Sequence, residues 1–308
     1  MQSADIIGVE DVSDLFVAYP NLTEPGAGRL VFLPEMHSAT GFMAAGASRQ
    51  CGLELQAEYK AAAPFPHTVI DQFLPPEILE MCLQAFPGEA ASTDSAFDRA
   101  QERLKTQFNP DALSDRARTL FYAFNAQPFI RVLENITGIR GLIPDPYFLG
   151  AGFHEVANGG HLSIHADFNH HKPMNLERRI NVLIYLNKAW SADYGGQLEL
   201  WDTAMKGCVR RVIPEFNRCV IFNTTSNSYH GNPDPVRHPG QVPRRSIALY
   251  YYTSTWSPQT REHTTQFKVR KGTQDRADWR VRRNELVADF LPPILGRGLR
   301  RLMGGSDA

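Results

Sequence analysis

The chain has 308 residues, 43% of them hydrophobic, and a formal net charge of −1 at pH 7. This length suits one large domain with appendages or two small domains, and the hydrophobic share is ordinary for a soluble protein with a full core. The near-neutral charge excludes a global field that would draw nucleic acid or an anionic membrane.

The cysteines and the N-terminal residues indicate the cellular compartment of the protein. The 4 cysteines include no CxxC pair, which argues against a zinc site, and free thiols are favoured over a Cys208–Cys219 pair across a hairpin. The first residues lack the pattern of a signal peptide, and no apolar run reaches the roughly 20 residues of a membrane span. We therefore predict a cytoplasmic protein without a membrane span.

In chain order, residues 1–50 are predicted to be irregular, because prolines and glycines interrupt them. Residues 52–63 are predicted as a short helix. A strand over residues 67–73 follows, and then a helix that starts near Pro76, since proline is favoured in the first turn of a helix. The apolar residues of 77–86 recur at helical spacing and are assigned to the core.

Residues 93–137 are predicted to carry two further helical stretches. In the second, apolar residues recur with helical period over 113–124 and again over 129–136, with Pro128 between them and Gly138 after them. We expect these helices to pack against a sheet.

From residue 147 the pattern changes to short alternating runs separated by Gly, Asn, Asp and Pro, which is typical of β structure. The predicted strands lie at 147–156, 161–167, 179–187, 196–201, 208–213, 218–223 and 244–253. Helices first and strands second predict an α+β fold, a sheet sandwich with helices on one outer face. A last helix near 279–291 and a basic tail at 296–305 are also predicted.

Two strands indicate which face should look inward. In 179–187 the even-numbered residues from Ile180 are all apolar and should pack on the helices, so the odd-numbered residues should look into the barrel. In 244–253 the same argument turns Arg244 and Ser246 inward, where a guanidinium and a hydroxyl can bind one carboxylate. The alternative is that Arg244 is a surface charge at a strand start.

The chemistry concentrates at GGHLSIHADF (159–168). His165 and Asp167 are two residues apart, so in a strand their side chains project to the same face. An imidazole nitrogen and a carboxylate oxygen suit a divalent transition metal, and His230 in NSYHG (227–231) is the best third ligand. Two histidines and one carboxylate form the facial triad of non-haem Fe(II) oxygenases, which leaves positions open for a co-substrate and O2.

The order of these motifs resembles that of the Fe(II)/2-oxoglutarate-dependent dioxygenases and, within them, the prolyl 4-hydroxylase-like group. The resemblance covers roughly residues 64–256 and follows the order PFPHTVIDQFL, HAD, YLN, GGQLEL, distal His and Arg-x-Ser. It implies a double-stranded β-helix (jelly-roll) core with the N-terminal helices on one outer face. The implied dioxygenase domain spans 64–272, between an N-terminal extension (1–63) and a C-terminal helix with a basic tail (273–308).

The resemblance also implies roles for single residues. His165, Asp167 and His230 would bind iron and form the catalytic centre. Arg244, with Ser246 beside it, would grip the distal carboxylate of 2-oxoglutarate. The other residues expected at the co-substrate are Tyr185, Asn181 and Leu198.

One position departs from the family pattern. The family often has a tyrosine on the strand before the His-x-Asp motif, and residues 153–160 contain none. His154 or Val156 is expected in its place.

The implied reaction couples the oxidative decarboxylation of 2-oxoglutarate by O2, to succinate and CO2, with hydroxylation of an aliphatic C–H. Ascorbate is predicted as an optional reductant. The carboxylate of Asp167 argues for hydroxylation, because halogenating relatives have a small residue at this position.

We predict a small-molecule or peptide substrate, with a prolyl or other amino-acid unit favoured by the resemblance, and no nucleic acid. Arg179 at the pocket mouth, with Trp201 and Tyr229 as an apolar wall, would bind it; the alternative is that Arg179 pairs with Glu177 or Asp193 at the surface. The same chemistry on a sugar, lipid or nucleobase is the alternative function, and a non-catalytic jelly-roll binding protein is a second. The sequence leaves the oligomeric state open.

Overall fold

The computed structural model describes residues 31–33, 36–37, 43, 45–91, 94–257 and 259–276. The predicted helix at 279–291 and the basic tail lie outside these residues, as does most of the predicted N-terminal extension. The three-part division of the chain at residues 63 and 272 therefore stays a prediction.

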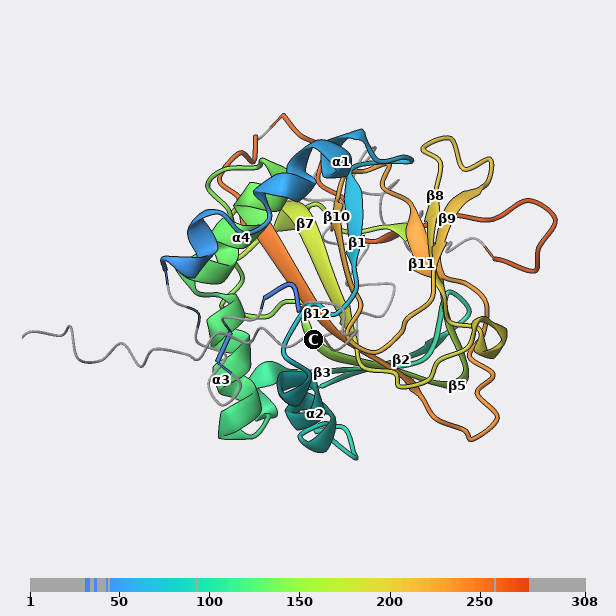
Figure 1. The fold of residues 1–308 in the computed structure, drawn as a ribbon. Helices are drawn as coiled ribbons and strands as arrows, with labels where there is room; N and C mark the ends of the chain where they lie inside the picture. Colours follow the sequence, from blue (N-terminus) through green and yellow to red (C-terminus); the bar gives the residue numbers. More distant parts are fainter. Residues whose placement is uncertain are drawn as a thin grey trace, which may run out of the picture.

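A curled antiparallel sheet forms the centre of the molecule (Figure 1). One layer has the order β1-β10-β7-β12-β5, and the second continues as β5-β11-β8-β9. The bounds are β1 His67–Ile70, β5 Gly152–Ala166, β7 Leu176–Tyr185, β8 Leu198–Trp201, β9 Cys208–Val212, β10 Cys219–Asn223, β11 His230–Asn232 and β12 Arg244–Thr253. Because the long strand β5 belongs to both layers, the sheet folds over on itself, and the predicted jelly-roll core is confirmed.

The corner of the sheet lies within β5, at two glycines. Gly159 has a φ of +85°, and a Cβ atom on Gly160 would come within 2.7 Å of the Arg103 carbonyl oxygen. Only glycine meets both conditions without strain. These glycines let residues 152–156 pair with β12 in the first layer while the following HLSIHA segment pairs with β11 in the second.

Four helices cover one face of the first layer. They are α1 Gln56–Ala61, α2 Pro76–Gln84, α3 Asp115–Phe124 and α4 Gln127–Thr137. Figure 1 shows α1, α3 and α4 beside β7 and β12, with β8, β9 and β11 on the opposite side. Ile180, Val182 and Ile184 of β7 share one buried apolar cluster with Phe121 and Leu133 of the helices. The predicted packing of helices on one outer face is thus confirmed.

One predicted helical stretch is wrong. Residues 95–108 form a hairpin of β2 Ser95–Arg99 and β3 Glu102–Phe108. β3 pairs along β5, with Glu102 opposite Leu162 and Phe108 opposite Phe153, so the free edge of β5 decides the structure of this segment. The second predicted stretch is confirmed as α3 and α4, and Gly138, with a φ of +73°, caps the C-terminal end of α4.

The remaining elements are short. The short strands are β4 Ile143–Pro144, β6 His170–His171 and β13 Gln266–Phe267. The 3-10 helices are Ala47–Arg49, Leu53–Leu55, Pro110–Ala112 and Ala192–Tyr194, the last of which has Ser191 as its N-cap. The cysteines 51, 82, 208 and 219 are all free thiols. Within the described ranges, no helix combines the length and the apolar character that crossing a membrane requires.

The predicted strand faces hold along most of β7 and β12. Ile247, Leu249 and Tyr251 of β12 join the helix-facing cluster, while Arg244 and Ser246 face the other way. The start of β7 differs, because Tyr251 pairs with Ile180 whereas the next residue, Tyr252, pairs with Arg178. Arg179 is therefore the extra residue of a bulge, which turns Arg178 rather than Arg179 to the inner face.

Candidate metal centre and its cavity

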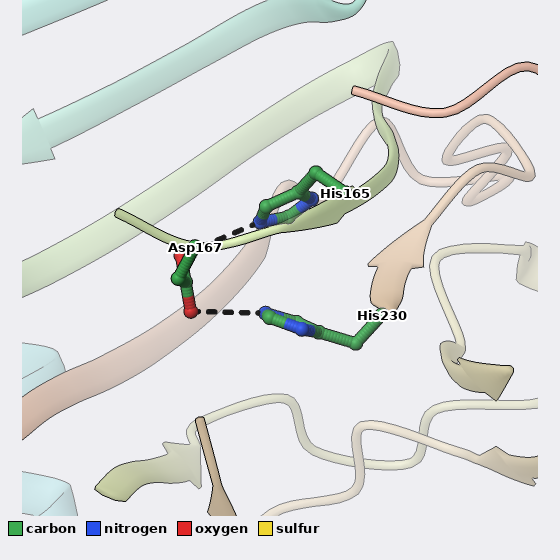
Figure 2. Close-up of side chains that lie close together, drawn as sticks. All are labelled: His165, Asp167 and His230. Carbon is green, nitrogen blue, oxygen red and sulfur yellow. Dashed lines mark ion pairs between the residues drawn. The ribbon is translucent and has the colours of Figure 1, made fainter. Parts of the chain in front are cut away.

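Three potential metal ligands meet between β5 and β11. His165 lies opposite His230 in the strand register, and Asp167 follows β5 directly. Figure 2 shows their side chains pointing toward one another, with ion pairs from Asp167 to both histidines. The His165 Nε2–Asp167 Oδ1 distance is 3.6 Å and the His230 Nε2–Asp167 Oδ2 distance is 3.3 Å. One ligand atom from each residue lies within 4.8 Å of the others, which is close enough for one ion.

Hydrogen bonds set the protonation of both imidazoles. His165 Nδ1 lies 2.9 Å from the Ser163 carbonyl oxygen, and His230 Nδ1 lies 2.9 Å from that of Ser228. A carbonyl oxygen only accepts, so each Nδ1 carries a proton, and the neutral form of each ring would keep its Nε2 lone pair for a metal. Burial, together with the neighbouring His230, lowers the pKa of His165 and favours this neutral form.

Asp167 is held as a carboxylate by the groups around it. Asn181 Nδ2 donates to Oδ2 at 2.7 Å, and Arg178 Nη2 lies 3.1 Å from the same oxygen. Burial by itself raises the pKa of Asp167, but the Arg178 guanidinium more than offsets it, and the pKa lies well below its usual range. Two neutral imidazoles and one ionised carboxylate are the donor set of non-haem Fe(II) sites.

These three residues line a cavity of about 240 Å³. Arg244, Ser246, Asn181 and Leu198, all predicted for the co-substrate site, line the same cavity. So do His154 and Val156, at the place where the family often has a tyrosine. The structure thus gathers residues from β5, β7, β8, β11 and β12 around one space.

The Arg244 side of this cavity is suited to an anion. Arg244 is 5% exposed, and its Nε donates to the Gly196 carbonyl oxygen at 2.7 Å. No carboxylate among the described residues pairs with it. Tyr185 lies beside it, with its ring 5.0 Å from the guanidinium carbon, and its buried hydroxyl has no hydrogen-bond partner in the described part of the chain. A buried cation and an unsatisfied hydroxyl side by side fit a bound carboxylate.

The predicted substrate-binding residues do not line the cavity. Arg179 forms an ion pair with Glu177 at 3.9 Å and donates a hydrogen bond to Thr253 Oγ1 at 3.3 Å. This agrees with the alternative that Arg179 pairs with Glu177 rather than binding a substrate. Trp201 Nε1 donates to Glu199 Oε2 at 2.8 Å, and the ring of Tyr229 lies under the Lys268 ammonium. Strict alternation along β7 predicted that Arg179 faces the cavity. The bulge at Arg179 shifts the alternation by one residue, so its side chain lies outside the cavity.

Arg178 is a cavity residue in contact with the candidate metal ligands that sequence reasoning missed. It is 2% exposed, lines the cavity and contacts Asp167. The pair Arg178-Arg179 is visible in the sequence, but the bulge that chooses between them depends on pairing with β12 and leaves no local signal.

Comparison with known proteins places this region in a family. Residues 151–287 match the model of the 2OG-Fe(II) oxygenase superfamily, and this range contains the three potential ligands and Arg244. Residues 151–287 belong to this superfamily. The membership confirms the predicted family and its cofactor set of Fe(II), 2-oxoglutarate and O2. Ascorbate and a cytoplasmic location stay predictions.

Similar proteins include one from mouse. The chain is 33% identical over 79 residues to a protein of Mus musculus named prolyl 3-hydroxylase OGFOD1. The match covers 24% of this chain and only 14% of the mouse protein.

Solved structures of similar fold include a Pseudomonas putida prolyl-4-hydroxylase, with 16% identity, a TM-score of 0.45, and coverage of 65% of this chain and 98% of that one. A prolyl hydroxylase from Trichoplax adhaerens, solved with a peptide fragment of hypoxia inducible factor, has 17% identity, a TM-score of 0.44, and coverage of 65% and 88%.

Proposed function

We propose that this 2OG-Fe(II) oxygenase domain is a dioxygenase that hydroxylates an aliphatic C–H of a prolyl or other amino-acid unit and releases succinate and CO2. The observation that carries the proposal is a facial triad in one cavity with Arg244, a buried cation for which the described residues offer no carboxylate. A metal and a dicarboxylate would therefore find their partners side by side.

In this proposal His165, Asp167 and His230 hold Fe(II). Iron with 2-oxoglutarate and O2 supplies the oxidising chemistry, while the protein supplies orientation and the exclusion of water. The Arg244 guanidinium and the Tyr185 hydroxyl hold the distal carboxylate of 2-oxoglutarate, with Ser246 beside them. Apolar side chains such as Leu198 close the wall around it.

The substrate part of the proposal has a narrower basis. It is supported by the name of the mouse relative, over 79 matched residues, and by the sequence resemblance to the prolyl 4-hydroxylase-like group. Since Arg179, Trp201 and Tyr229 lie outside the cavity, they would contact only parts of a peptide that extend beyond it.

The test is a substrate panel. Purified protein with Fe(II) and 2-oxoglutarate is offered free proline, proline-containing peptides, other amino acids, nucleosides, sugars and fatty acids. Each is scored for succinate formation coupled to a mass gain of one oxygen. We expect coupling for a proline or amino-acid unit and none in the His165→Ala or His230→Ala proteins.

The other outcomes separate the parts of the proposal. Oxidation of a sugar or lipid alone would refute the substrate and leave the cofactor chemistry standing. Binding of 2-oxoglutarate without succinate from any compound would favour a non-catalytic jelly-roll binding protein.

A further inference from the structure

We propose that Asn181 and Arg178 act as positioning residues that restrict Asp167 to a single metal-binding oxygen, Oδ1. The inference rests on the proposed function, because it concerns how the proposed iron site keeps its open positions. It adds to that function two residues that bind the carboxylate rather than the metal.

The two carboxylate oxygens of Asp167 have different partners. Oδ2 of Asp167 accepts a hydrogen bond from Asn181 Nδ2 at 2.7 Å and lies 3.1 Å from Arg178 Nη2. The Asn181 amide uses one lone pair of Oδ2, and the Arg178 guanidinium forms an ion pair with the same oxygen. Each oxygen faces one imidazole, Oδ1 at 3.6 Å from His165 Nε2 and Oδ2 at 3.3 Å from His230 Nε2. Because Asn181 and Arg178 both contact Oδ2 and neither contacts Oδ1, we assign Oδ1 to the metal.

The orientation of the Asn181 amide follows from its contacts with Arg178. Its Oδ1 accepts from Arg178 Nε at 3.1 Å and from Arg178 Nη2 at 2.7 Å. A guanidinium only donates, so this end of the amide must be the oxygen, and the nitrogen must face Asp167. Arg178 thereby fixes the amide in the one orientation that donates to the carboxylate.

Aromatic rings and hydrogen bonds hold the Arg178 side chain in place. Its guanidinium carbon lies 3.6 Å from the ring centroid of Tyr250 and 4.4 Å from that of Phe168. The side chain is 2% exposed. Two aromatic faces and two hydrogen bonds to Asn181 leave it little freedom, so the donors on Asp167 Oδ2 are preorganised.

The contacts on Oδ2 would determine how many coordination positions of the metal stay open. Fe(II) held by His165, Asp167 and His230 would need its remaining positions for 2-oxoglutarate and O2. A carboxylate that bound through both oxygens would occupy a position needed for one of the co-substrates. Holding Oδ2 away from the metal therefore keeps the site competent for both.

The test compares Asn181→Leu and Arg178→Met with Arg179→Met, a neighbouring arginine outside the cavity. Co(II) titration of each metal-free protein gives the metal affinity. Anaerobic Fe(II) with 2-oxoglutarate gives the visible charge-transfer band of the chelate, which a merely structural role would not move. We expect a loss of about 10–100-fold in Co(II) affinity and a weakened band for the first two variants.

Asn181→Leu decides the outcome, because Leu keeps the γ-branched shape of Asn and lacks a hydrogen-bond donor. Thermal unfolding of this variant without metal shows whether it folds. A folded Asn181→Leu protein with less than about a threefold loss of Co(II) affinity and an intact band would overturn the inference, as would an equal loss in Arg179→Met. Asp167→Ala separates this from the proposed function: if it keeps full Co(II) affinity, the metal assignment itself fails.

Discussion

At the scale of single residues, the surroundings of a side chain decide its chemistry more than its type does. Arg244 and Arg245 are adjacent, yet one is buried in the cavity and the other pairs with Glu155 at 2.8 Å near the surface. Strand alternation predicted this difference from the sequence. Arg178 and Arg179 are an equally adjacent pair, and there alternation failed because a bulge shifts the phase by one residue.

The first prediction concerns the co-substrate. Arg244→Ala should raise the 2-oxoglutarate concentration needed for half-maximal succinate formation more than about a hundredfold, since removing one partner of a buried charge pair costs about 3–5 kcal/mol. Arg245→Ala, the matched control, should change it little, because Arg245 does not line the cavity and pairs with Glu155 instead. The reverse ranking in the same succinate assay would contradict the placement of the inner face of β12.

The second prediction concerns pH. Burial, aided by the charge of Lys105, lowers the pKa of His154 to about 3. The folded chain then binds fewer protons than the unfolded chain below the ordinary histidine pKa of about 6.5, so folding stability falls as the pH falls from about 6.5 toward 3. Between about pH 7 and 5 this amounts to about 2 kcal/mol.

His154→Gln should remove that contribution while keeping a donor for the Gly150 carbonyl oxygen, which lies 2.9 Å from His154 Nε2. Urea unfolding of both proteins at several pH values measures the difference. If the two stability curves run parallel between about pH 7 and 5, His154 is not held neutral by the fold.

At the scale of elements, turns and pairings position the site. The sequence predicted the strands because alternation is a local signal. The structure places Gly196 against Arg244, where its carbonyl oxygen accepts from Nε. The β2–β3 hairpin could not be predicted in this way, because its strand character comes from the edge of β5, far away in the sequence.

The third prediction concerns this glycine. Gly196 has a φ of +69°, and a Cβ atom there would lie 2.9 Å from Arg244 Cδ. Gly196→Ala should cost about 1–2 kcal/mol in the free energy of unfolding and should also weaken 2-oxoglutarate binding, because the strained turn displaces Arg244. Thermal unfolding and the succinate assay check both effects.

Gly207→Ala is the control, since Gly207 has no atom within 4 Å of an added Cβ. It should change the free energy of unfolding by no more than about 0.5 kcal/mol. A Gly196→Ala protein that behaves like this control would show that the glycine does not position Arg244.

At the scale of the whole molecule, the two faces of the first sheet layer have separate tasks. The helix-facing side, with Ile180 and Ile247, forms the main apolar core, and the opposite side carries the cavity. This division was predictable because it follows from residue periodicity. The residues that face the cavity from β3, such as Lys105 and Gln107, were not predictable, because no local pattern ties them to ligands that begin at His165.

The most direct test of the central claim uses 18O2. With Fe(II), 2-oxoglutarate and a substrate from the panel, one labelled oxygen should enter succinate and one should enter the hydroxylated product, in equal amounts. The Asp167→Ala protein should form neither labelled compound. Labelled succinate at wild-type levels from Asp167→Ala, or product whose new oxygen comes from water, would contradict a facial-triad dioxygenase at His165, Asp167 and His230.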